Sequence, residues 1–297
     1  MKKLGLVVYL MAGAALVVSG FATAERGLKS NNKMQLEKVA KDYEELGNMG
    51  FEGYCPLDYK IAFSDGEKEI VVDYNDGDYK TSEREAVYGG LVGSIYQNGD
   101  EFEVVVPEYD TWTSISAVSG QQLSYVIWHE SFHAYQNTYF NVLENAGGGL
   151  SETELAAQID TDPELKRSFT RKLEKLYEAI NAENTGDIRR IAIEYIDIVR
   201  ERDAMLSESQ KKSEVFYEMV EGSAYYVEAG AALCENGREA YEKEYLETAG
   251  TYADGNAKYY RLGMLECMLL DKLDPDWKTS YSFDRALEEV IAEYVNN

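Results

Sequence analysis

Hydrophobic and polar positions divide the chain into two parts with different periodicities. In the first part, short apolar runs pair around turn sequences, which is the pattern of β-hairpins. The runs span 60–63 and 69–74 around Ser64-Asp65-Gly66, and 91–96 and 102–106 around Asn98-Gly99. A polar amphipathic helix over 31–46 precedes them. We therefore expect a small antiparallel or mixed sheet.

Strand signals nearly vanish after Gly147-Gly148-Gly149, where helical spacing takes over. Ser151 and Glu154 predict a capping box, and Asp162-Pro163 predicts the start of a helix. The expected helices span 163–181, 188–207, 213–233, 238–248, 256–273 and 282–295. The sequence thus predicts an α+β fold, with a sheet subdomain over 25–146 and a mainly helical subdomain over 147–297.

A further helix is expected at the end of the sheet subdomain. Its apolar positions are Leu123, Val126, Ile127, Phe132 and Tyr135. Ser119 with Gln122 predicts a capping box at its start. The same stretch contains the pattern His129-Glu130-x-x-His133, which uses both histidines of the chain.

This motif indicates metal chemistry. The two histidines are four positions apart, so on a helix they share one face and suit a tetrahedral zinc site. Glu130 follows the first histidine, where its carboxylate can hold and deprotonate a water molecule. We expect one catalytic zinc ion, with His129 and His133 as ligands and Glu130 as the general base. Gln136, one turn beyond His133, either supports a ligand or faces solvent.

Charge and cysteine content narrow the functional classes. The formal net charge of −25 opposes binding to nucleic acid and to anionic membranes. The three cysteines match no zinc or redox spacing. Either Cys234 pairs with Cys267 between neighbouring helices, or Cys55, Cys234 and Cys267 all stay thiols.

The first 24 residues are typical of a secretory signal. Lys2-Lys3 precedes an apolar run over 4–18, and Ala22-Thr23-Ala24 offers small residues for cleavage before Glu25. The pattern predicts a secreted or envelope-attached, extracytoplasmic protein cut after Ala24. An uncleaved N-terminal membrane anchor is the alternative.

A catalytic zinc site usually has three protein ligands and one open position. Since there is no third histidine, the last ligand must be a carboxylate or a cysteine. Glu221, within a predicted helix, is the best candidate. The alternative for Glu221 is a solvated helix face, because Glu214, Glu218 and Glu228 lie nearby. Glycine weakens a helix interior, so Gly222 indicates close packing, for example against the motif helix.

The run 221–228, Glu-Gly-Ser-Ala-Tyr-Tyr-Val-Glu, is similar to the Glu-Gly-Phe-Ala-x-Tyr-x-Glu run of aminopeptidase N relatives. With the His-Glu-x-x-His motif, it makes the chain resemble the gluzincin branch of the zincin metallopeptidases. The resemblance implies a zincin-like fold and assigns the third zinc ligand to Glu221. Tyr260-Arg261-Leu262-Gly263 is similar to the Tyr-Glu-Lys-Gly of these enzymes, which implies that Tyr260 stabilises the oxyanion.

The resemblance covers three short patches, and the chain departs from those aminopeptidases elsewhere. The segment between the two histidines and the downstream glutamate is far longer, and no Gly-x-Met-Glu-Asn motif holds a substrate amino terminus. Exopeptidase action is therefore not implied. Tyr225, Tyr226 and Tyr259 are alternatives to Tyr260 as the oxyanion donor.

The sequence as a whole predicts a zinc metallopeptidase, a hydrolase that acts on peptides or proteins. Two other functions fit the same motif. One is a non-catalytic zincin-like module that binds peptides or partner proteins, and the other is a zinc hydrolase of a non-peptide amide or ester. Glu130 disfavours the binding module, because binding alone needs no general base.

Overall fold

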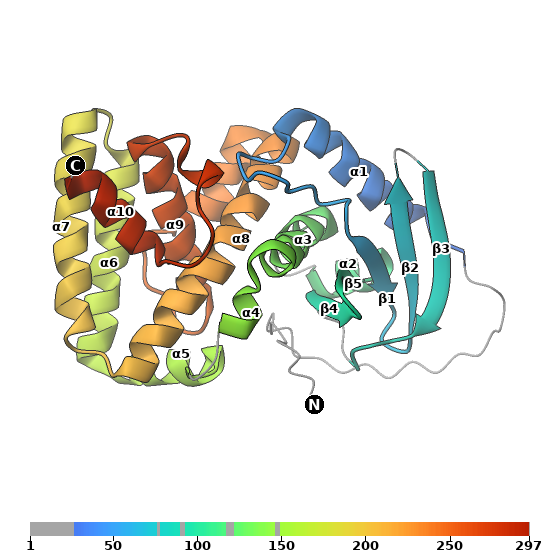
Figure 1. Cartoon of the computed structure of the whole chain (residues 1–297), viewed down its shortest axis with the longest axis horizontal. Coiled ribbons are helices and arrows are strands. Elements are labelled where there is room, and N and C mark those ends of the chain that lie inside the picture. Colours follow the sequence, from blue (N-terminus) through green and yellow to red (C-terminus); the bar gives the residue numbers. More distant parts are fainter. Residues whose placement is uncertain (1–26, 76–77, 90–92, 117–121, 146–148, 297) are drawn as a thin grey trace. The chain divides into compact units, whose positions relative to one another are not determined.

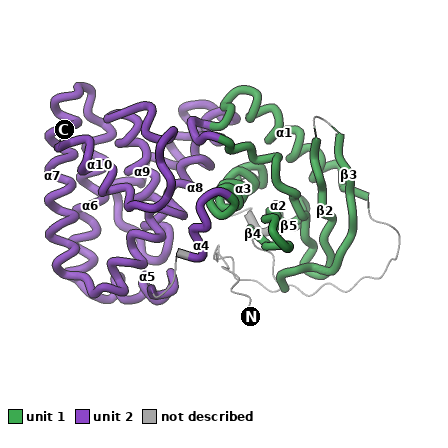
Figure 2. Tube along the Cα trace, in the orientation of Figure 1, with its two compact units in different colours: residues 1–48, 53–138 green, residues 49–52, 139–297 purple. Residues whose placement is uncertain are grey.

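The computed structural model of the chain describes residues 27–75, 78–89, 93–116, 122–145 and 149–296. A five-stranded mixed sheet, a histidine-bearing helix and a mainly helical C-terminal part follow one another (Figure 1), which confirms the predicted α+β class. The chain forms two compact units (Figure 2): unit 1 comprises 1–48 and 53–138, and unit 2 comprises 49–52 and 139–297. The predicted signal segment 1–24, the predicted boundary at 146–147 and Ser119 lie outside the described residues.

Unit 1 is built on a sheet with the strand order β3-β2-β1-β5-β4. The strands are β1 (Lys60–Ser64), β2 (Lys68–Asn75), β3 (Asp78–Glu85), β4 (Ser94–Asn98) and β5 (Glu101–Pro107). β1 pairs antiparallel with β2, and β4 pairs antiparallel with β5, so both predicted hairpins are confirmed. β1 also pairs parallel with β5, which joins the two hairpins into one mixed sheet.

Strand β3 forms without a hydrophobic signal in its sequence. Seven of its eight side chains are exposed and the other is half-buried, so the strand shows no alternation of apolar and polar residues. Its antiparallel ladder with β2 runs from Lys68↔Glu85 to Asn75↔Asp78. Because β3 is held by this backbone pairing, reasoning from hydrophobic pattern missed it.

Helices α1 (Ser30–Leu46), α2 (Tyr109–Ser116) and α3 (Leu123–Phe140) complete unit 1. The predicted N-terminal helix is confirmed by α1, and the predicted motif helix by α3. Lys38 of α1 lies over the Tyr125 ring, 5.6 Å from its centroid, so α1 packs on α3. Residues 123–137 of α3 are all buried, and the helix is therefore enclosed on every side.

Both faces of the sheet are partly covered. Ala62, Val71 and Val105 cluster on one face, under Val87, Tyr88 and Tyr96. The alternate positions on the other face include the buried residues Ile61, Phe63, Val72 and Val104. The edge strand β4 begins beside α3, because an ideal Cβ at Gly93 would be 2.8 Å from Val126 Cγ1. The sheet therefore presents one of its edges to the motif helix.

Unit 2 is mainly helical over the described residues. Its elements are α4 (Val142–Asn145), α5 (Glu152–Thr161), α6 (Pro163–Asn181), α7 (Thr185–Asp203), α8 (Glu208–Tyr241), the π-helix η1 (Glu242–Leu246), α9 (Ala257–Leu273), the 3-10 helix η2 (Trp277–Thr279) and α10 (Leu287–Asn296). The predicted capping box of Ser151 and Glu154 is confirmed at α5. Asp162 caps α6 by accepting from the backbone N–H of Glu164 and of Leu165.

Helix α8 begins earlier than predicted, because Ser207 and Gln210 form a capping box that the hydrophobic spacing did not show. Gly237 has a φ of 76°, which interrupts the helix close to the predicted end. Between these two points, α8 buries four glutamates: Glu214, Glu218, Glu221 and Glu228.

Two glycines let α8 and α9 approach closely. An ideal Cβ at Gly222 would lie 2.4 Å from Gly263 Cα, and one at Gly263 would lie 1.9 Å from the carbonyl oxygen of Glu218. No side chain larger than hydrogen fits at either position. The close packing predicted at Gly222 is therefore made with α9.

A cluster of charged side chains is buried in unit 2. Glu218 of α8, Glu266 of α9 and Glu288 of α10 each place a carboxylate oxygen within 4.8 Å of the others. The ammonium group of Lys172, from α6, lies 3.0 Å from Glu218 and 3.4 Å from Glu288. Glu214 lies 3.5 Å from the same ammonium group, which thus contacts three carboxylates. If Glu214, Glu218, Glu266 and Glu288 were all ionised, their four negative charges would exceed the two positive charges of Lys172 and Arg202 by two.

Burial and mutual repulsion keep protons on this cluster. Burial, and then the charge of Glu288, raise the pKa of Glu266 to about 8. Burial also raises the pKa values of Glu218 and Glu288. For Glu214 burial acts in the same direction, but Arg202 outweighs it and holds the pKa below its usual value. At neutral pH the core of unit 2 therefore contains protonated carboxyl groups.

Neither a disulfide nor a membrane-spanning helix is found among the described residues. Of the two alternatives for the cysteines, the structure shows the thiols, since Cys55, Cys234 and Cys267 form no disulfide. Burial raises the pKa of the Cys267 thiol well above its usual value. None of the described helices combines the length and apolar character that a membrane crossing requires.

The carboxylate cluster predicts that stability falls as the pH rises from about 5 to about 8. The pKa of an unfolded glutamate is about 4.3, so in this range the folded cluster binds more protons than the unfolded chain. Each extra proton lowers the free energy of unfolding by about 1 kcal/mol per pH unit. Glu266→Gln removes one titrating group but keeps an acceptor for the Tyr195 hydroxyl. Urea unfolding of both proteins across this range should therefore give a shallower dependence for the variant, and parallel curves would contradict the prediction.

Candidate metal centre

Helix α3 brings its two imidazole rings together. His129 and His133 are 5% and 3% exposed, and their Nε2 atoms are 3.1 Å apart. Two nitrogen ligands of one tetrahedral zinc ion, each about 2.0–2.1 Å from the metal, lie roughly 3.3 Å apart. The observed separation is therefore close to the one that a shared zinc ion requires.

Gln136 orients one of these rings. Its Oε1 lies 2.8 Å from Nδ1 of His133, and the side chain is fully buried. An amide oxygen can only accept, so Nδ1 carries the proton of the ring. In the neutral ring, Nε2 then presents its lone pair, as a ligand nitrogen must. Gln136 therefore supports His133 and does not face solvent.

Buried polar groups also hold the backbone of the motif helix. The Tyr54 hydroxyl donates to the carbonyl oxygen of Trp128 at 3.1 Å. Ser131 Oγ lies 3.0 Å from the same carbonyl oxygen and 3.0 Å from the Tyr54 hydroxyl. The Tyr54 ring packs edge-on against the Trp128 indole. These contacts stabilise the turn of α3 that begins immediately before His129.

Glu221 occupies a rigid part of α8. Its side chain is 1% exposed, and the next residue, Gly222, makes the close contact with Gly263 of α9. Ser223 binds back to its own helix, since its hydroxyl donates to the carbonyl oxygen of Met219 at 2.6 Å. The backbone around Glu221 is thus held by packing on α9 and by local hydrogen bonding.

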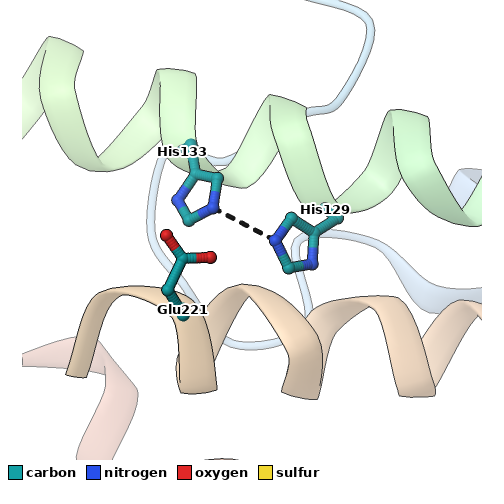
Figure 3. Close-up of side chains that lie close together, drawn as sticks. All are labelled: His129, His133 and Glu221. Atoms are coloured by element: carbon teal, nitrogen blue, oxygen red, sulfur yellow. Dashed lines mark hydrogen bonds between the residues drawn. The ribbon is translucent and has the colours of Figure 1, made fainter. Parts of the chain in front are cut away.

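The three candidate ligands lie together (Figure 3). One ligand atom from each of His129, His133 and Glu221 lies within 4.8 Å of the other two. Two imidazoles and one carboxylate are a donor set of catalytic zinc sites, which keep a fourth position open. Burial rules out the solvated helix face considered for Glu221. Among the described residues, no cysteine belongs to the group.

Glu130 lies beside these residues without being one of the three. Its side chain is 1% exposed, and its Oε1 lies 2.6 Å from an ideal Cβ position on Gly93. Tyr88 is also near: burial raises the pKa of its phenol, and the negative charge of Glu130 raises it further. The carboxylate thus points towards the start of the edge strand β4.

Tyr260 lies on α9, with its ring centroid 6.2 Å from that of Tyr225. Tyr225 is one turn beyond Glu221 on α8. Two alternative donors lie elsewhere: the Tyr226 hydroxyl donates to an aspartate of α9 at 2.6 Å, and Tyr259 is fully buried against Phe169, near the charges of Glu214 and Glu218. Tyr260 and Tyr225 therefore stay as candidate donors to an oxyanion.

Sequence reasoning missed the two neighbours of Glu130 in unit 1. Gly93 belongs to the glycine-rich stretch 89–93, which gave only a weak signal of a special conformation. Tyr88 is one of 24 tyrosines, and nothing in the sequence distinguishes it from the others. Only the folding of β4 against α3 brings these residues to Glu130.

No protein-family model matches the chain, and comparisons with curated proteins and with solved structures give no match. The chemistry of the site is therefore inferred from its own residues. These residues provide a donor set for one metal ion and a carboxylate beside it.

Glu221→Gln should weaken zinc binding, because the amide keeps the size of the side chain but loses the anionic donor. The loss should exceed the roughly 10- to 100-fold typical of removing a supporting hydrogen bond. Glu228→Gln is a matched control on the same buried helix, where an amide can still accept from the Tyr245 hydroxyl. Competition with a zinc-binding dye measures both affinities. Equal zinc affinity in the two variants would show that Glu221 is not a ligand.

Proposed function

We propose that the chain is a zinc-dependent metallopeptidase of the gluzincin type. The observation that supports this most strongly is the buried group of His129, His133 and Glu221 with Glu130 next to the first histidine. Three ligands leave one coordination position open for chemistry, whereas structural zinc sites usually have four. Hydrolysis needs a general base in addition to a metal, and the carboxylate of Glu130 can act as that base.

Each residue of the site would have its own role in hydrolysis. Zinc, when bound, supplies a Lewis acid that polarises the scissile carbonyl and makes water more acidic. Glu130 accepts a proton from the attacking water and passes it to the leaving amine. Gln136 keeps His133 in the tautomer of a ligand. Tyr260, or Tyr225 in its place, donates a hydrogen bond to the oxyanion.

Strand β4 offers a surface for an extended peptide. It lies at the end of the sheet, and among the described strands it pairs only with β5. A peptide added as a further strand would gain backbone hydrogen bonds along the other edge. Since the start of β4 touches Glu130, such a peptide would pass close to the general base.

The proposed setting is outside the cytoplasm. Lys2-Lys3, the apolar run over 4–18 and the small residues before Glu25 support export of the chain. The net charge of −25 makes a nucleic-acid substrate unfavourable. Peptides or proteins are therefore the proposed substrates, with retention by an uncleaved N-terminal anchor as the alternative to secretion.

Glu130→Gln should abolish most hydrolysis while zinc stays bound. Glutamine has nearly the same volume but cannot accept a proton at neutral pH, and general-base catalysis contributes roughly 10²- to 10⁴-fold. The fall should appear in kcat, measured on a peptide library and then on the best single substrate. Zinc content and thermal midpoint, measured on the same preparations, should not change.

Glu144→Gln, an exposed change on α4, is the control for purification and handling. Undiminished peptidase activity in Glu130→Gln would mean that another site or a contaminant hydrolyses the substrate. If zinc is bound but no peptide is cleaved by the parent protein, an amide or ester substrate of another class, or a binding role, takes the place of the proposal.

A further inference from the structure

Gly93 occupies a position where no side chain fits. It precedes β4, and an ideal Cβ there would lie 2.6 Å from Glu130 Oε1 and 2.8 Å from Val126 Cγ1. The same Cβ would lie 3.2 Å from Glu130 Cδ. Real Cβ atoms essentially never lie within 3.0 Å of such atoms. The carboxylate of Glu130 is therefore in the space that a side chain at this position would need.

The contact with α3 sets Gly93 apart from glycines that serve a turn. The described glycines with positive φ are Gly47, Gly50, Gly53, Gly66, Gly99, Gly237 and Gly255. For Gly93, the observed feature is its contact with α3: the space for a Cβ is taken by Val126 and Glu130. Four residues earlier, an ideal Cβ on Gly89 would have no neighbour within 4 Å. What distinguishes Gly93 is the absence of a side chain against α3.

Both atoms that exclude a side chain come from the same face of the motif helix. Val126 and Glu130 are four positions apart on α3, so the start of β4 lies across one turn of that face. Val126 is a buried packing residue, 1% exposed. Glu130 is the proposed general base. The same contact therefore joins sheet packing and the position of the base.

We propose that Gly93 is a positioning residue for Glu130: its bare Cα sets how far the carboxylate lies from the motif-helix backbone and hence from the reacting water. This inference rests on the proposed role of Glu130 as general base. A methyl group at this position would move the carboxylate by several tenths of an ångström to about 1 Å, and a displacement of 1 Å can cost about 10²-fold in rate. The three atoms nearest to this Cβ position belong to Val126 and Glu130, so the proposed role of Gly93 concerns the base and not the metal ligands.

The test compares Gly93→Ala with Gly89→Ala in the full-length zinc-loaded protein. We expect Gly93→Ala to lower kcat roughly 10- to 100-fold. Zinc content and KM should stay close to those of the parent, and the thermal midpoint should fall only by the few degrees that overpacking beside Val126 costs. Gly89→Ala should behave like the parent. A joint loss of zinc, thermal midpoint and activity in Gly93→Ala would indicate a purely structural glycine and would overturn the proposal.

A second variant tests the contact itself. In Gly93→Ala/Val126→Ala, the methyl group can move into the space left by Val126 and away from the carboxylate. We expect kcat to recover at least several-fold relative to Gly93→Ala, with Val126→Ala alone as the reference, which is the logic of a double-mutant cycle. Strictly additive effects on kcat would overturn the proposal. Because the double variant has less crowding at this contact, it can be measured even where Gly93→Ala alone folds poorly.

A binding measurement separates this inference from the proposed function. Acetohydroxamic acid chelates zinc, and it transfers its proton to a neighbouring base when it does so. Its affinity for the zinc form should fall in Glu130→Gln and in Gly93→Ala, but not in Gly89→Ala. If Glu130→Gln weakens binding and Gly93→Ala does not, the role of Gly93 is refuted while that of Glu130 stands. If the parent binds the probe in this pattern but cleaves no peptide, only the peptidase assignment fails.

Discussion

Burying imidazole and carboxylate groups costs free energy unless they are hydrogen-bonded or bound to a cation. Helix α3 buries His129, Glu130, His133 and Gln136 on one enclosed helix, and α8 buries Glu221. Packing alone would not require polar residues at these positions, because apolar side chains fill a core without this cost. Hydrogen bonds offset part of this cost, as the bond between Gln136 and His133 shows. One metal ion could bind all three donors of His129, His133 and Glu221.

In the charged cluster of unit 2, a cation of the chain itself meets the same constraint. There, Lys172 supplies a cation within the chain, and raised pKa values leave protons on the carboxyl groups around it. Carboxylates alone are typical of harder ions than zinc, whereas two imidazoles with one carboxylate match zinc. The two buried groups therefore differ in composition, and only the one on α3 and α8 has the donors of a catalytic zinc site.

Local geometry explains what the sequence could predict. The pairing of His129 with His133 follows from helical spacing, the hairpins from their turn residues, and the start of α5 from its capping box. Contacts between distant segments could not be predicted in this way. They include the parallel pairing of β1 with β5, the packing of Gly222 on Gly263 and the contact of Gly93 with Glu130. The strand β3 could not be predicted from hydrophobic pattern, because backbone pairing with β2, rather than burial of side chains, holds it. Helical spacing alone could not single out Glu221, since other glutamates share its helix, and the resemblance then assigned it as the ligand.

The metal content of the purified chain tests the central claim most directly. Elemental analysis of the full-length protein should find about one zinc ion per chain, as expected for a single three-ligand catalytic site. His129→Ala and His133→Ala should each lose most of that zinc, since each removes one ligand while α3 stays enclosed by its packing. A parent protein that holds no zinc and cannot be loaded with it would contradict the account. So would histidine variants that bind zinc as tightly as the parent.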